Sequence, residues 1–391
     1  MKKIILIIIA IAVCFSPSMG GFAFAAEDDE NLDATVNDAL NNIDLSGYDE
    51  LIALLNEYND YSFGKSARQI IDDILYGKAE PTFGYFIKAA GSVLGIELSD
   101  MLPQLVIITV IAFLYGILKN LNSGFLSSGT QKIVFLACYA LSITVLSYMF
   151  VDSIKYSIRT FDFLKKFNDA CFPVLITLMS AFGATTSAAV YQPFVLIFSN
   201  TLMTLVNSVI MPLFYVTFVF GLVGNLSENL KLDKFSSVAK SIAEWTLGIV
   251  FGTFVTLLTA QGITGSSIDN LATKGAKYAL SGYVPVIGGY LKDGFDIVTA
   301  SCVVIKNAVG LCALIILLAG ILIPIIKMTA LSFGLKITAA VAEPLSDNKF
   351  SSVLNTAGES LKVLIVAVIC SGVSLLITIM LIIYTCNPGN L

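Results

Sequence analysis

Long apolar runs separated by short polar stretches dominate the chain after residue 103. A helix that crosses a bilayer needs about 20 mostly apolar residues. The runs that approach or reach this length are residues 103–118, 133–151, 245–263, 307–326 and 363–384. Residues 170–227 carry no charge and are too long for one span. They predict two spans, with a break near Tyr191, Gln192 and Pro193.

Other apolar stretches are interrupted by charged residues. Residues 285–305 contain Asp293 and Asp296 and are typical of a weak, interrupted element. Residues 331–342 are short and contain Lys336, so they lie in the interface or re-enter the membrane. Residues 83–98 are interfacial or re-entrant; a crossing there would reverse the orientation of every later span. The pattern predicts an all-α, polytopic membrane protein with seven or eight spans.

The first 26 residues have the pattern of a signal peptide. Lys2 and Lys3 precede an apolar stretch over residues 4–15, and Ala23 and Ala25 offer small residues for cleavage. An uncleaved membrane anchor is the alternative. Cleavage would leave residues 27–102 as an exported, extracytoplasmic segment.

Amphipathic helices are expected in this exported segment. Leu51, Leu54 and Leu55 recur at helical spacing, and Ser66 with Gln69 forms a capping-box pattern. Such helices either pack on the membrane portion as a small cap or form a docking face for another extracytoplasmic protein.

Charge is sparse and unevenly distributed. Hydrophobic residues make up 56% of the chain and charged residues 13%, against about 25% charged residues in ordinary soluble proteins. Residues 27–102 carry 16 acidic and 4 basic side chains, whereas residues 103–391 carry 12 and 17. The acidic segment argues against nucleic acid as a partner, because binding to phosphates needs basic patches.

Several kinds of catalytic site are excluded by composition. The chain contains no histidine, which rules out Ser-His-Asp catalysis and histidine-bound zinc or haem. It has no Gly-x4-Gly-Lys-Ser/Thr phosphate loop, and its seven cysteines show no Cys-x2-Cys spacing. We therefore expect no enzyme activity, no cofactor and no metal site.

An internal repeat is visible in the second half of the chain. The Lys-Phe-Ser-Ser-Val sequence beginning at Lys234 recurs at Lys349, and Glu244 and Glu359 follow at the same spacing. Paired prolines and a Phe-Gly-Leu sequence recur in the same order, offset by 112 to 115 residues. We therefore divide the membrane portion into the first two spans (103–164), repeat 1 (165–263) and repeat 2 (277–385).

Each repeat is predicted to hold three crossings, and an odd number would turn the second copy upside down. Inverted repeats are typical of secondary transporters. Orientation from basic loops is ambiguous: with an exported N-terminus, Lys155, Arg159, Lys165 and Lys166 would lie outside, although basic loops favour the cytoplasm.

Charged residues within membrane segments are costly and are candidate functional groups. The candidates for a transport path or for coupling are Asp293, Asp296, Lys306, Lys327 and Lys336. The candidate interface residues equivalent between the repeats are Lys234, Glu244, Lys349 and Glu359.

Several segments resemble the stage III sporulation protein AE family. They are the acidic leader, Phe172-Pro173-Val174, the Tyr-Val-Pro-Val-Ile-Gly-Gly sequence that ends at Gly289, and the Lys-Asn-Ala-Val-Gly-Leu sequence that starts at Lys306. The resemblance covers most of the chain from about residue 40 onward. It carries over no catalytic or ligand residue.

The resemblance implies a multi-pass subunit, in the mother-cell membrane around the forespore, of the channel-like complex that joins the two cells. Its implied partners are other stage III membrane and ring-forming proteins and a cytoplasmic secretion-type ATPase, besides the lipid bilayer. The favoured function is a platform or export gate. A self-sufficient secondary transporter with inverted repeats and a purely structural anchor for the ring proteins are the alternatives.

Overall fold

The all-α prediction is confirmed. The computed structural model describes residues 36, 38, 40–58, 64–76, 83–121, 128–181, 184–224, 232–283, 288–346 and 348–384, and no strand occurs in these ranges. The predicted signal peptide lies outside them. The helices are α3 (Ser46–Tyr58), α4 (Ala67–Leu75), α5 (Phe83–Leu121), α6 (Ser128–Ala181), α7 (Thr185–Leu205), the π-helix η1 (Val206–Ile210), α8 (Met211–Gly224), α9 (Asp233–Tyr283), α10 (Gly288–Leu345) and α11 (Asn348–Tyr384).

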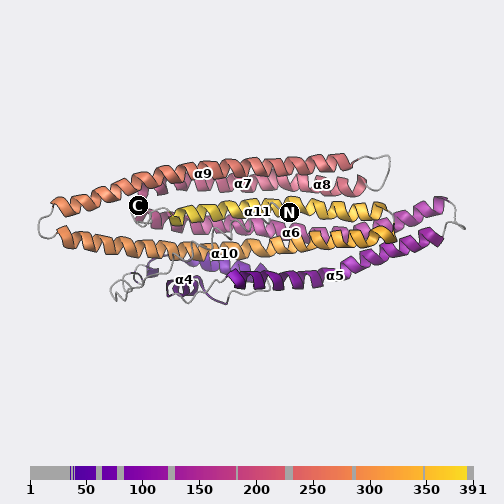
Figure 1. Cartoon of the computed structure of the whole chain (residues 1–391), viewed down its shortest axis with the longest axis horizontal. Coiled ribbons are helices and arrows are strands. Elements are labelled where there is room, and N and C mark those ends of the chain that lie inside the picture. Colours follow the sequence, from indigo (N-terminus) through magenta and orange to yellow (C-terminus); the bar gives the residue numbers. More distant parts are fainter. Residues whose placement is uncertain are drawn as a thin grey trace.

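The long helices lie side by side in an elongated bundle (Figure 1). α11 occupies its centre and contacts α6, α8, α9 and α10. α10 has 58 residues and α9 has 51, which at 1.5 Å per residue gives lengths of about 87 and 76 Å. Both exceed twice the roughly 30 Å thickness of the hydrocarbon core.

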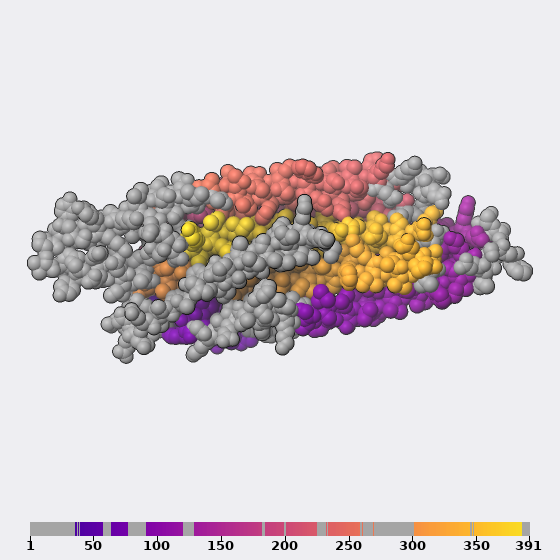
Figure 2. All heavy atoms as spheres, viewed as in Figure 1, coloured from indigo at the N-terminus to yellow at the C-terminus, as the bar shows by residue number. Residues whose placement is uncertain are grey.

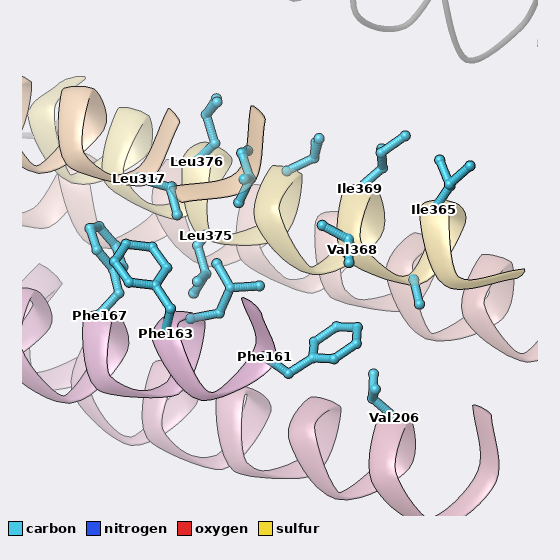
Figure 3. Packing of buried hydrophobic residues seen from close by; sticks show 14 of the residues in the cluster. Phe161, Phe163, Phe167, Val206, Leu317, Ile365, Val368, Ile369, Leu375 and Leu376 are labelled. Atoms are coloured by element: carbon cyan, nitrogen blue, oxygen red, sulfur yellow. The ribbon is translucent and has the colours of Figure 1, made fainter. Parts of the chain in front are cut away.

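Apolar side chains from α6, α10 and α11 form the core. Figure 3 shows Phe163 and Phe167 of α6 directed toward Leu317 of α10 and Leu375 of α11. Phe163, Phe167 and Leu317 are at most 2% exposed. Burial of each such side chain stabilises the fold by about 1.5–3 kcal/mol. Because most of α11 is enclosed, its apolar run serves packing within the protein.

The two short N-terminal helices pack on this bundle. Ser66 and Gln69 form the predicted capping box at the start of α4, and Leu51 and Leu55 of α3 are buried. The backbone N–H of Ala67 donates to Asp49 Oδ1 at 2.7 Å, which ties α4 to α3. Both helices contact α10, and α3 also contacts α6. The apolar stripes are therefore covered, as in the cap interpretation.

The predicted break at Tyr191–Pro193 is wrong, because α7 runs through Pro193. α6 ends at Ala181 and α7 begins at Thr185 instead. The backbone N–H of Ala184 donates to Met179 O at 3.0 Å and closes the end of α6. A membrane helix tolerates an internal proline where neighbouring helices satisfy the freed backbone groups, so proline alone did not locate the turn.

Pro212 marks an irregularity within a continuous rod. α7, η1 and α8 follow one another without a gap, and the π-helix η1 ends two residues before Pro212. Proline lacks a backbone N–H and its ring clashes with the carbonyl four residues earlier. A π-turn inserts one extra residue and accommodates that clash, so α7 and α8 form one span.

Six helical stretches in the described part of the chain are long and apolar enough to cross a membrane. They are Gly91–Lys119, Gly129–Ala181, Thr185–Gly224, Lys234–Leu258, Ser301–Pro344 and Asn348–Tyr384. The predicted count of seven or eight is not confirmed. The difference arises because residues 285–305, 307–326 and 331–342 belong to one helix, α10. Likewise, residues 83–98 continue into 103–118 as α5.

The two matched segments lie at the same end of the bundle, which corrects the predicted inversion. Lys240, six residues after Lys234, forms a 2.8 Å ion pair with Glu359, ten residues after Lys349. α9 and α11 both start at the right-hand end of Figure 1 and run in the same direction. Each matched unit contributes two candidate spans, α7–α8 with α9 and α10 with α11. An even number of crossings keeps both copies upright.

The approach of α6 to α10 at Gly320 gives a test of the packing. A Cβ atom there would overlap the ring of Phe163, whereas a Cβ at Gly248 would meet nothing within 4 Å. We expect Gly320→Ala to destabilise the fold by about 1–3 kcal/mol, because overpacking forces the ring to move. Gly248→Ala should be neutral or stabilising by up to about 1 kcal/mol. Unfolding of the purified protein in detergent measures both; equal stabilities would contradict the packing.

Candidate functional site: charged groups between the helices

Glu359 of α11 joins three long helices through its carboxylate. Its Oε2 lies 2.8 Å from Nζ of Lys240 on α9, and Nζ of Lys362 lies 2.5 and 2.6 Å from its two oxygens. Lys336 of α10 also donates to Oε1. The four side chains are 23–29% exposed. We call Lys240, Lys336, Glu359 and Lys362 the Glu359 cluster.

Small residues beside the cluster bring its helices together. A Cβ at Gly358 would lie 3.0 Å from the Ser332 carbonyl oxygen, and the Ser332 hydroxyl donates to Gly358 O at 2.8 Å. In the matched unit, the Ser236 hydroxyl donates to Thr217 O at 2.7 Å and joins α8 to α9. The α8–α9 hairpin and the α10–α11 hairpin are therefore each closed by a hydrogen bond from a serine hydroxyl to a backbone carbonyl near the same end of the bundle.

A polar groove leads to this cluster from the ends of α10 and α11. Its lining residues include Lys336, Glu343, Asn348, Ser352 and Asn355. One carboxylate faces three ammonium groups in the Glu359 cluster, so the cluster carries a formal charge of +2. Partial exposure to a polar groove makes this excess charge tolerable, because water can solvate the lysines.

A second ion pair joins α5, α6 and α10. Nζ of Lys327 lies 2.8 Å from Oε1 of Glu97, and the two side chains are 13% and 12% exposed. The same Nζ donates to the Tyr156 hydroxyl at 3.1 Å and lies 4.3 Å from the ring centroid. Because both charges are largely removed from water, each depends on its partner.

Lys306 fixes the far end of the central helix. Its side chain is fully buried, and Nζ donates to the backbone carbonyl of Ile383 at 2.9 Å. The last carbonyls of a helix lack backbone partners and carry partial negative charge. The ammonium group therefore satisfies the C-terminal end of α11.

Asp269 performs the opposite task at the start of α7. Its carboxylate accepts the backbone N–H groups of Thr186 and Ser187 at 3.1 and 2.8 Å. Ala184, at the N-cap position, provides no side-chain bond. A carboxylate at a helix N-terminus complements the partial positive charge there, so α9 supplies the cap that α7 lacks.

The remaining predicted residues do not gather at one place. Lys234 and Glu244 are exposed, and Nζ of Lys349 lies 5.6 Å from the Phe135 ring centroid. Asp293 and Asp296 belong to α10, but their side chains lie outside the described part. Among the predicted residues whose side chains are described, the structure thus brings together Lys336 and Glu359.

Sequence reasoning missed the partners Lys240, Lys362, Glu97, Tyr156 and Asp269. The three-residue spacing of Glu359 and Lys362 is a helical-pair signal that could have been found. The other contacts join distant parts of the chain, and no local pattern encodes them. Within the described ranges, no three histidine, cysteine, aspartate or glutamate side chains gather as metal ligands.

Comparison with known proteins identifies related sequences. A family model described as stage III sporulation protein AE matches residues 65–386. A protein of Bacillus subtilis (strain 168) named stage III sporulation protein AE is 25% identical over 260 residues, covering 66% of this chain and 64% of that protein. The match therefore spans somewhat less than two thirds of the relative's length. No solved structure matches.

The contacts of the Glu359 cluster predict that neutralising Glu359 and neutralising its repeat equivalent Glu244 will change protein stability by different amounts. We expect Glu359→Gln to destabilise the protein by about 1–2 kcal/mol, less than a fully buried pair because water screens the cluster. Glu244→Gln is the matched control, since Glu244 is exposed and should change stability little. Detergent unfolding curves measure both; equal losses would show that the contacts of Glu359 contribute nothing specific.

The Lys327–Glu97 pair can be isolated by a double-mutant cycle. Glu97→Gln, Lys327→Met and the double variant should give a coupling free energy of about 1–2 kcal/mol, because both groups are largely buried. The exposed Lys65–Asp73 pair, whose lysine is 59% exposed, should give less than about 1 kcal/mol in a parallel cycle. Additive effects at Lys327 and Glu97 would refute the pair.

Proposed function

We propose that the chain, which belongs to the stage III sporulation protein AE family, is a membrane component of a sporulation channel or secretion complex. In this proposal it serves as a platform or export gate between mother cell and forespore. It is not an enzyme, and a cytoplasmic partner ATPase supplies the energy. Its other partners are stage III membrane proteins and ring-forming proteins in the space between the two membranes.

One observation carries the proposal of a platform. Lys306, Lys327 and Lys336 each contact another helix: the end of α11, Glu97 of α5 and Glu359 of α11, respectively. These charges are spread along α10 and fix helices to one another. Such an arrangement favours a rigid membrane framework over a chain of groups that passes a substrate along.

The secondary-transporter alternative has lost its main support. It depended on inverted repeats, and the matched units run in the same direction. The structural-anchor alternative retains support from α3 and α4, which pack on α10. If the N-terminal segment is exported, as we propose, these helices lie outside the cytoplasm, in the space between the mother-cell and forespore membranes.

Neutralising two acidic residues distinguishes a gate from an anchor. We expect Asp293→Asn combined with Asp296→Asn to reduce heat-resistant spores severely, because a gate needs charged groups at the N-terminal end of α10. The chain should still accumulate in the membrane and co-purify with its partners. Asp162→Asn, at an exposed position of α6, is the matched control and should sporulate normally.

Normal sporulation by the Asp293→Asn, Asp296→Asn variant would instead favour the anchor. Normal sporulation after complete deletion of the gene would refute any sporulation role. Loss of membrane accumulation in the double variant would assign these aspartates to folding and refute their role in gating.

A further inference from the structure

The exposed surface of α6 changes character along its length. Over residues 133–151 the exposed side chains are mainly large and apolar, including Ile133 (68% exposed), Leu141 (58%) and Tyr148 (67%). No charged residue occurs between positions 133 and 151. This stretch is about 28 Å long at 1.5 Å per residue, which matches the hydrocarbon thickness of a bilayer.

Charged side chains begin on α6 directly after this apolar stretch. The opposite face of the same segment is buried and carries Phe161, Phe163 and Phe167. Exposed charges at nearly every turn are incompatible with contact to lipid tails, so residues 152–169 have the pattern of a helix in water. The exposed charged residues are Asp152, Lys155, Arg159, Asp162, Lys165, Lys166 and Asp169.

The neighbouring helices show the same boundary. On α5, most exposed apolar residues lie between Leu102 and Leu118; exposed Asp100 lies just before them, and only Leu94 and Ile96 are large, apolar and exposed on its other side in the described part of the helix. On α10, Phe333, Ile337 and Val341 are exposed. The Lys327–Glu97 pair, with Tyr156, lies between these apolar surfaces and the charged half. Tyrosine is enriched at membrane–water interfaces.

The exposed apolar surface extends further toward the charged half of the bundle on the side of α7 and α9 than on the side of α5. Exposed apolar residues extend there to Ile197 and Leu257. α9 forms the upper edge and α5 the lower edge of the molecule in Figure 2. The different extents on these two edges indicate that the bundle axis is tilted relative to the membrane normal.

The other half of the bundle is covered by charged N-terminal helices. A Cβ at Gly47 of α3 would lie 3.0 Å from Cβ of Ala170 on α6, and Sγ of Cys312 on α10 lies 3.9 Å from Ala67 O. Exposed ion pairs lie at α4, among them Lys65–Asp73, whose lysine precedes the helix. A bilayer around Cys312 would bury these pairs in lipid.

We propose that lipid acyl chains surround only one half of the bundle, and that the half containing residues 152–181 of α6 stands in water. The lipid-covered surface, which we call the lipid belt, comprises residues 102–118, 133–151, 197–223, 245–257 and 333–341. The strongly apolar residues 307–326 and 363–384 then form mainly the internal core of a projecting stalk. This placement goes beyond the proposed function and does not depend on it.

The single tryptophan of the chain provides a probe of the belt. Trp245 on α9 is 72% exposed and lies within it. In phosphatidylcholine vesicles containing the full chain, brominated acyl chains should quench most Trp245 emission, and aqueous iodide should quench little. A second variant carries Trp245→Phe and Lys165→Trp; its emission should respond to iodide and not to brominated lipid.

A probe at position 165 distinguishes the proposed placement from a bilayer centred on residues 307–326. Lys165 is exposed, so the substitution should leave folding intact, and it lies beside Phe163, which contacts the Gly320 region of α10. A bilayer centred on residues 307–326 would surround position 165 with lipid. Quenching of the Lys165→Trp variant by brominated lipid, or strong iodide quenching of Trp245, would overturn the proposal. A third variant, Trp245→Phe with Leu141→Trp, should behave like Trp245; if iodide quenches it, the belt is refuted.

Discussion

The ion contacts of Glu359 fix the ends of two helical hairpins to one another. α9 comes from the first hairpin and α10 and α11 from the second, and all three supply a lysine to this carboxylate. A charge in a largely apolar bundle must be paired or solvated, so the contact also limits how the helices can slide. The positions of the Lys327–Glu97 pair and of the Lys306 contact with α11 follow the same rule at other levels of the bundle.

The matched sequences have diverged in their surroundings. Glu244 and Glu359 occupy equivalent positions after the same pentapeptide, yet Glu244 is exposed while Glu359 has three partners. The reason is position in the bundle: α11 is central, whereas α9 lies at an edge (Figure 1). The glutamate with several ion pairs is thus the one on the helix that other helices enclose. Equivalence in sequence predicted two three-crossing units and did not predict the different surroundings of the two glutamates.

Local signals predicted the elements well and their arrangement poorly. The Ser66 capping box and the all-α class follow from capping chemistry and hydrophobic spacing, and these were confirmed. The turn after Ala181 could not be predicted, because Pro193 is accommodated inside α7 and Asp269 caps that helix from α9. Lys336 was selected as a costly membrane charge and Glu359 as a repeat-equivalent interface residue, but Lys240 and Glu97 became partners through tertiary packing alone.

Hydropathy fails most clearly for α10 because it does not distinguish lipid from protein interior. Residues 307–326 are strongly apolar, and many of them, including Cys312, Ala313 and Leu317, are buried by other helices. The less apolar residues 331–342 include Lys336, whose contact with Glu359 makes its charge tolerable there, and expose Phe333 and Ile337. Transfer out of water favours burial in lipid and burial inside the protein alike. A run of apolar residues therefore indicates that the segment is buried, but not whether lipid or protein surrounds it. The exposed face of each helix indicates whether lipid or water surrounds it. On α6 that face is apolar before Asp152 and charged after it. A helix of this length can cross a bilayer with its first half and serve as a water-exposed strut with its second.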